Sequence, residues 1–189
     1  MTLHCAILYN PDKKVEHQEY LALIKHLVSV LPDSLEQKSS EGWSPLHVAV
    51  YTEQEDIISY LISIGANQRS RDRAGRNMAH SLLVHQSYHN AKNNAKQLRK
   101  ILDLFDKAQL KEMMLERCTQ TPGALTPLAF WMAKDAGTYR KAGIVKVLTG
   151  YSTGEELEMI NGEGDLPLHV VSRHSTIRQG GKIVTQHRL

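Results

Sequence analysis

Apolar residues recur at intervals of three and four along three stretches of this chain, the spacing that places side chains on one face of an α-helix. The stretches are residues 24–31, 98–105 and 144–148, and a proline at position 32 ends the first of them. Alternating apolar and polar positions, which are typical of a half-buried strand, are scarce. The pattern therefore predicts an all-α protein.

A second pattern is shorter and more specific. Its clearest copy is residues 41–50, which read EGWSPLHVAV and are followed by a second apolar helix pattern and by Gly65. Pro45 suits the first turn of a helix, where its missing amide hydrogen costs nothing, and the Ser44 hydroxyl can cap that turn. His47 can bridge to the backbone of the adjoining turn and so join one unit to the next. Gly65 supplies the left-handed residue that ends the second helix.

This unit resembles the ankyrin repeat, whose signature is Gly-x-Thr-Pro-Leu-His-x-Ala followed by a second helix and Gly-Ala-Asp. Weaker copies begin at residues 2, 72, 126 and 164, and Ala129 stands where the fourth motif should have its histidine. The spacing from His47 to His80 is the 33 residues usual for the family, whereas the other spacings are longer, so the array is irregular. The resemblance implies a solenoid of stacked helix pairs joined by finger loops. We expect repeats at about 1–38, 39–71, 72–120, 121–160 and an incomplete 161–189.

The longer spacings place extra residues in two kinds of position. Polar connections between first and second helices are expected at residues 10–18, 86–95 and 135–142. Residues 107–117, with Leu110, Met113 and Met114, are expected to add a helical turn or two. The two methionines are expected to fill the core beside the solenoid, and the alternative is a partner-binding stripe. Residues 182–189 resemble the opening of a second helix. Neither end has the polar capping repeat that closes a solenoid, which favours a piece of a longer protein.

Composition narrows the class of protein. Apolar residues make up 41% and charged residues 23% of the chain, values typical of a folded globular protein. No apolar run approaches the roughly 20 residues that span a bilayer, and the N-terminus has no signal-peptide pattern. Cys5 and Cys118, the two cysteines, fit a reducing compartment better than a disulfide framework. We expect an intracellular protein of the cytoplasm or nucleus.

Residues that could carry chemistry form no complete set. Four of the ten histidines fall on the structural position of the motif. His85 and His89 are spaced as zinc ligands on one helix face, but no third ligand is identifiable. The glycines near positions 162 and 180 lack the surrounding pattern of a phosphate-binding loop. The sequence therefore predicts no catalytic residue, no metal, no cofactor and no small-molecule substrate.

Charge is concentrated in two of the expected finger loops. Residues 69–76 contain four arginines opposed only by Asp72, and residues 155–165 contain five acidic residues and no basic one. Two ordinary solvated loops would also account for this distribution. The net charge of +3 is small for a nucleic-acid binder, so binding of nucleic acid or anionic lipid is disfavoured. We expect a protein partner that presents an acidic surface to residues 69–76. The alternative is a regulatory segment of an enzyme or membrane-associated protein whose active domain lies outside this chain.

The resemblance also implies which residues meet the partner. In ankyrin proteins, these are the residues just before the Thr-Pro-Leu-His motif and those four and five places after its histidine. The partner-binding residues implied here are Glu41, Trp43, Tyr51, Thr52, Arg73, Arg76, His85 and Lys134, and the same positions include Ala74, Val84, Leu125 and Ala133. An exposed Trp and Tyr beside arginines are typical of an interface hot spot. The alternative for Trp43 is that it folds back onto the neighbouring repeat.

Overall fold

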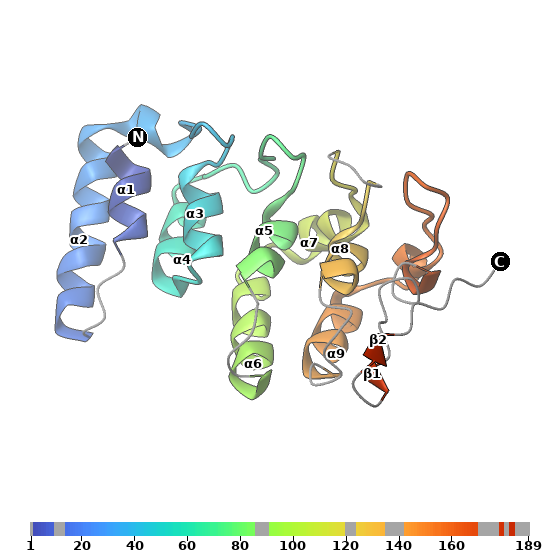
Figure 1. The fold of residues 1–189 in the computed structure, drawn as a ribbon. Coiled ribbons are helices and arrows are strands. Elements are labelled where there is room, and N and C mark those ends of the chain that lie inside the picture. The colour runs from blue at the N-terminus through green and yellow to red at the C-terminus, as the bar shows by residue number, and fades with distance from the viewer. Residues whose placement is uncertain are drawn as a thin grey trace.

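The chain is a row of helix pairs in the computed structural model, which describes residues 2–9, 14–85, 91–119, 124–134, 142–169, 178–179 and 182–183 (Figure 1). The first helices of the pairs are α1 (Thr2–Leu8), α3 (Pro45–Tyr51), α5 (Met78–His85) and α8 (Pro127–Lys134). The second helices are α2 (Lys14–Val30), α4 (Glu55–Ser63), α6 (Ala91–Leu102) and α9 (Ala142–Tyr151). The predicted all-α solenoid of stacked helix pairs is confirmed.

Neighbouring pairs pack along both rows of helices. In the first row α1 packs on α3, α3 on α5, and α5 on α8, while in the second row α4 packs on α6 and α6 on α9. The core between the rows contains most of the periodic apolar residues found in the sequence. Those that are buried include Ile24, Leu98, Ile101, Leu102, Ile144 and Leu148. Leu31 is an exception, being 47% exposed, because α2 ends at Val30.

The finger loops lie along one edge of the row (Figure 1). Main-chain hydrogen bonds join three of them in succession. The amide of Arg73 donates to the carbonyl of Glu41, and the amide of Thr119 donates to the carbonyl of Ala74, both at 3.0 Å. Short 3-10 helices, η1 (Pro32–Leu35) and η3 (Glu155–Leu157), lead into the first and last of the fingers.

The predicted extra helix in the third repeat is α7 (Lys107–Leu115). Asp106 caps it by accepting the amides of Ala108 and Gln109, both at 3.0 Å. Met113 and Met114 are buried, as the core-filling interpretation requires. Because α7 packs on both α5 and α8, it lies directly behind the first helices of two repeats.

Three predicted loops are shorter than expected because helices begin earlier. The connections were predicted at 10–18, 86–95 and 135–142, and the second helices start inside them, at Lys14, Ala91 and Ala142. The residues 10–13, 86–90 and 135–141, which precede these helices, lie outside the described part. Lysine, alanine, asparagine and glutamine tolerate a helix without showing an apolar period, so the pattern misses these turns. The prediction of a helix at residues 182–189 is wrong for its first two residues. There β2 (Lys182–Ile183) pairs antiparallel with β1 (Arg178–Gln179), and residues 184–189 lie outside the described part.

No helix in the described part of the chain is both long and apolar enough to cross a membrane. Cys5 is exposed and Cys118 is buried, and no disulfide joins them.

Candidate protein-binding surface

Two of the motif histidines, His4 and His80, join their own repeat to the next. His4 Nε2 lies 2.7 Å from the carbonyl oxygen of Trp43, and His80 Nε2 lies 2.9 Å from that of Leu125. In both cases the acceptor is the residue just before the capping position of the following motif. The histidine side chain thus fixes the finger of the next repeat against the first helix of its own, which sets the spacing of the row.

His47 closes a capping box at the start of α3 and is too deeply buried to carry charge at neutral pH. Its backbone amide donates to the Ser44 hydroxyl, and its Nδ1 accepts the Ser44 amide at 3.3 Å. Its Nε2 faces the carbonyl of Arg76, though without normal hydrogen-bond geometry. Burial lowers the pKa of both His47 and His80 from 6.5 to about 4. It outweighs the opposite effects of the nearby Asp72 charge and of the backbone carbonyl groups that the two rings face. These rings therefore support the fold and are not poised for acid–base chemistry.

The finger between the second and third repeats is organised by Asp72, whose side chain is fully buried. Its Oδ1 accepts the backbone amides of Ala74 and Arg76, both at 2.8 Å. Its Oδ2 accepts Arg76 Nε at 2.7 Å and the Trp43 indole Nε1 at 3.3 Å. One carboxylate therefore folds its own loop and also fastens that loop to the preceding finger.

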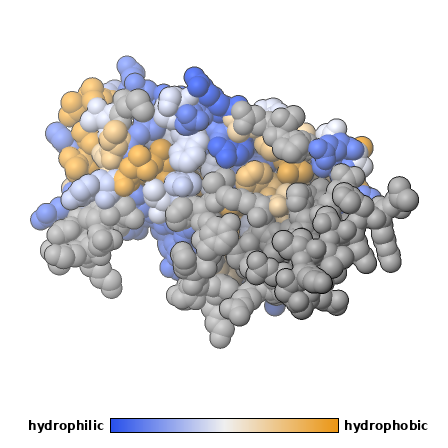
Figure 2. Space-filling view, in the orientation of Figure 1, coloured by the Kyte–Doolittle hydropathy of each residue, from blue (hydrophilic) through white to orange (hydrophobic). Residues whose placement is uncertain are grey.

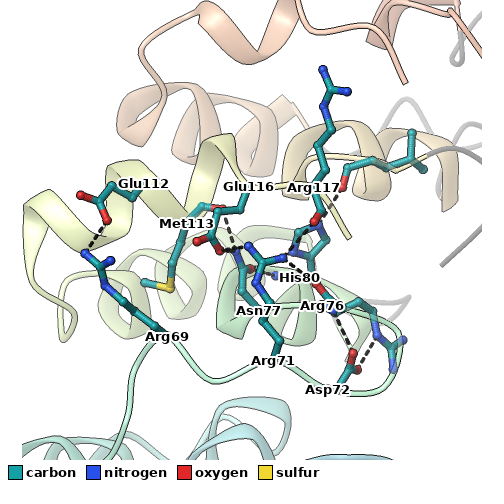
Figure 3. Close-up of polar contacts among 12 residues, drawn as sticks. Arg69, Arg71, Asp72, Arg76, Asn77, His80, Glu112, Met113, Glu116 and Arg117 are labelled. Carbon is teal, nitrogen blue, oxygen red and sulfur yellow. Dashed lines mark hydrogen bonds and ion pairs between the residues drawn. The ribbon is translucent and has the colours of Figure 1, made fainter. Parts of the chain in front are cut away.

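Two arginines of this finger have acidic partners on α7 or at its C-terminal end that the sequence did not reveal (Figure 3). Arg71 pairs with Glu116 at 2.9 Å and also donates to the carbonyl of Arg117 at 2.9 Å. Arg69 pairs with Glu112, and both of these side chains are more than half exposed. The interpretation that only Asp72 opposes the four arginines is therefore wrong. The finger is fastened to the extra helix of its own repeat.

Arg73 is the exception among the four arginines. It is exposed, and the described residues give it no acidic partner. An acidic protein surface as partner stays a prediction, and Arg73 is the side chain of the finger that remains available to meet it.

Trp43 folds back onto neighbouring parts of the chain, as the alternative interpretation had it. Its ring centroid lies 4.8 Å from that of Tyr51 at an interplanar angle of 53°, and its indole donates to Asp72. Its backbone carbonyl oxygen is the atom that His4 Nε2 contacts. The side chain is only half-buried, so part of the indole still faces solvent. Replacing Trp43 or Arg76 would therefore disturb the finger as well as any interface.

The other predicted residues differ in exposure. Glu41 is exposed, whereas Tyr51 and Thr52 are half-buried, and the Thr52 hydroxyl donates to the carbonyl of Val48 at 2.8 Å. His85 ends α5 and Lys134 ends α8, but their side chains lie outside the described part. Contact of any of these residues with a partner stays a prediction.

Two exposed residues at the same register were missed. Leu8 and Tyr9 stand four and five places after His4, as Tyr51 and Thr52 do after His47, and they are 53% and 75% exposed. The rule applied to the later repeats would have found them had it been extended to the first. They are the largest apolar and aromatic side chains that this register leaves open in the described residues.

The first helices also share an absence of charge. Helices α1, α3, α5 and α8 contain no acidic residue, and Lys134 is their one basic residue apart from histidines. Apolar side chains gather over the α1–α2 end of the face seen in Figure 2. The exposed apolar residues of these two helices and of the position after α2 are Leu8, Leu23, Val30 and Leu31. The face carried by the first helices is thus suited to an uncharged partner surface more than to a charged one.

Metal-binding side chains are dispersed in the described part of the chain, where no group of three or more histidine, cysteine, aspartate or glutamate residues could hold a metal ion. His89, the second member of the candidate zinc pair, lies outside this part.

Comparison with known proteins agrees with the geometry. Residues 41–73 match the ankyrin repeat family. The fold is similar to that of a chain in the solved structure of the Bd0816 predatory endopeptidase from Bdellovibrio bacteriovorus in complex with immunity protein Bd3460. That alignment covers 82% of this chain and 70% of the other, with 16% sequence identity and a TM-score of 0.57, and it bears on the fold alone. No curated protein matches this sequence significantly.

Proposed function

We propose that this chain, whose residues 41–73 form an ankyrin repeat, binds another protein through the face carried by its first helices. Ankyrin repeats are interaction modules rather than catalysts, and stacked repeats present an extended surface. The observation that carries the proposal is the pair Leu8 and Tyr9. Both are exposed at the register where ankyrin proteins contact their partners, on a row of helices without acidic residues.

The chemistry of the surface favours a mainly apolar contact. Exposed aromatic and aliphatic side chains contribute most when a partner covers them completely. Three of the four arginines in the charged finger already have carboxylate partners within the chain, which leaves Arg73 for an acidic group at the rim. The affinity should therefore depend weakly on salt, because rim charges act mostly on the rate of association.

Site-specific photo-cross-linking tests the proposal. A photoreactive phenylalanine analogue placed at Tyr9 should form cross-links to a partner protein. The same analogue placed at Ser59, which is exposed on the second helix α4, should form none to that partner. Equal cross-linking from both positions would contradict a binding face on the first helices.

Substitutions then measure the contribution of the anchor residues. Leu8→Ala and Tyr9→Ala together should weaken binding of the cross-linked partner by about 2 kcal/mol, the loss expected of a hot spot. Both side chains are exposed, so thermal stability should stay nearly unchanged. Arg73→Glu separates the two kinds of partner: a marked loss of affinity, together with strong salt dependence, would favour the acidic surface over the apolar contact.

A further inference from the structure

The last junction has no motif histidine at all, whereas each earlier junction has one, although His47 Nε2 at the second junction makes no hydrogen bond of normal geometry. Earlier bridges end on Trp43 and Leu125, each of which precedes the capping position of its motif, and the equivalent residue in the last motif is Asp165. Ala129 occupies the place of the histidine, and its methyl group cannot donate a hydrogen bond. Its amide still donates to the Thr126 hydroxyl at 3.4 Å, so the start of α8 is capped, but the lateral link is missing.

A shallow recess marks the same junction. The empty space is about 190 Å³ when the part open to solvent is included, and none of it is wide enough to hold a water molecule. One wall is formed by Leu125, Thr126 and Ala129, and the facing wall includes Asp165 and Pro167 of the last finger. Side chains around such a gap lose the contacts that a well-packed neighbour would provide. The recess therefore adds lost packing to the lost hydrogen bond.

A buried carboxyl group lies beside this junction. Glu156 of η3 is fully buried, and neither carboxylate oxygen has a hydrogen-bond partner. Because η3 packs on α7 and α8, this side chain belongs to the contact that holds the last finger on the solenoid. The equivalent residue in the first finger is Ser34, which precedes Trp43 by as many residues as Glu156 precedes Asp165. Unlike Glu156, Ser34 has a partner, because its hydroxyl donates to the carbonyl of Leu31 at 2.6 Å. A buried carboxyl group without a hydrogen-bond partner gains hydration when such a contact opens.

The preceding helix is held more firmly. α9 packs along α6, and the Tyr151 hydroxyl donates to Asp103 at 2.6 Å. Any opening at the last junction therefore starts after α9.

We propose that residues 154–169 form a unit that opens from the solenoid on its own, hinged after α9, while the preceding helices stay folded. The missing histidine, the recess and the buried carboxylate all weaken the same contact. Parts of a protein with fewer supporting contacts open locally at lower free energy than the whole. The inference concerns the free chain and does not depend on the partner-binding proposal.

Matched amides in three fingers allow a direct test by hydrogen exchange. The amides of Ser39, Asp72 and Asn161 each donate to the carbonyl four residues later, at 2.9, 3.1 and 2.8 Å. Local hydrogen bonding is thus the same, and differences in protection report on the support behind each finger. In the intact chain, the protection factor of Asn161 should be at least about tenfold lower than those of Ser39 and Asp72, equivalent to about 1.4 kcal/mol. Equal protection would overturn the proposal.

Two substitutions at the junction should close it. Ala129→His restores the bridge toward Asp165, and Glu156→Met replaces the unpaired carboxylate by an adaptable apolar side chain. Each should raise the protection factor of Asn161 about tenfold and leave that of Asp72 unchanged. Ala108→His and Glu158→Met, at exposed positions, are the controls and should have no such effect. If Ala129→His does not fold, Glu156→Met alone decides. No slowing in the folded variants would overturn the proposal.

Discussion

The carboxylate of Asp72 should contribute more to stability than any other charged group of its finger. It accepts four hydrogen bonds, two from backbone amides, one from the Trp43 indole and one from the Arg76 guanidinium, and it is fully buried. A hydrogen bond contributes about 1 kcal/mol net. The guanidinium is 24% exposed and can return partly to water, so its bond counts for less. Asp72→Ala should therefore lower the free energy of unfolding by about 3 kcal/mol.

Asp72→Asn separates the contribution of the two backbone amides from that of the two side-chain donors. Its amide oxygen can still accept the two backbone amides, but its NH₂ group faces the two side-chain donors, so we expect a loss of about 2 kcal/mol. Urea unfolding followed by circular dichroism measures both losses, and Asp72→Ala should lower the melting temperature by about 6 to 12 °C. Glu41→Ala removes an exposed carboxylate from the neighbouring finger and should change stability by less than about 0.5 kcal/mol. A loss below about 1 kcal/mol for Asp72→Ala, or an equal loss for Glu41→Ala, would refute the reasoning.

Two further predictions concern the pH dependence of stability and the replacement of two glycines by alanine. Acidification from pH 7 to pH 4 should lower the free energy of unfolding, because unfolded His47 takes up a proton near pH 6.5 whereas the folded ring does so only near pH 4. That difference is worth about 3 kcal/mol, with a similar loss from His80, and a flat pH profile in urea titrations would contradict it. Gly65→Ala and Gly75→Ala both place a side chain at positive φ, which costs about 1 kcal/mol. At Gly75 the added Cβ would also lie 2.2 Å from the Thr119 hydroxyl, so this variant should lose about 3 kcal/mol, and equal melting temperatures would show that the close approach is absent.

The histidine bridges illustrate what the sequence could predict. The capping hydroxyl of Ser44, the proline after it and His47 lie within four residues, so their geometry is decided by the local helix start. Extension of the same spacing rule to His4 identifies Leu8 and Tyr9, which means that the signal for the proposed contact residues was present in the sequence.

The ion pairs of the arginine finger could not be predicted in this way. Arg69 and its ion-pair partner Glu112 are 43 residues apart, and Arg71 is 46 residues from Arg117, whose backbone carbonyl accepts its hydrogen bond. Their contact depends on how α7 docks behind α5 and α8, which no local pattern specifies. A count of charges within residues 69–76 therefore gave an excess of positive charge that the folded chain largely neutralises. The buried position of Glu156 escaped prediction for the same reason, because its surroundings come from helices far away in the sequence.

Two of the links between successive fingers are made by main-chain atoms alone. Arg73 meets Glu41, and Thr119 meets Ala74, through their backbone amides and carbonyls. Such links are indifferent to the identity of the side chains at these four positions. The fingers can therefore accumulate substitutions and acquire new recognition properties while the array keeps its alignment. For protein engineering, the same independence makes positions 41, 73 and 74 suitable for randomisation in a binding library, whereas position 72 must be kept constant.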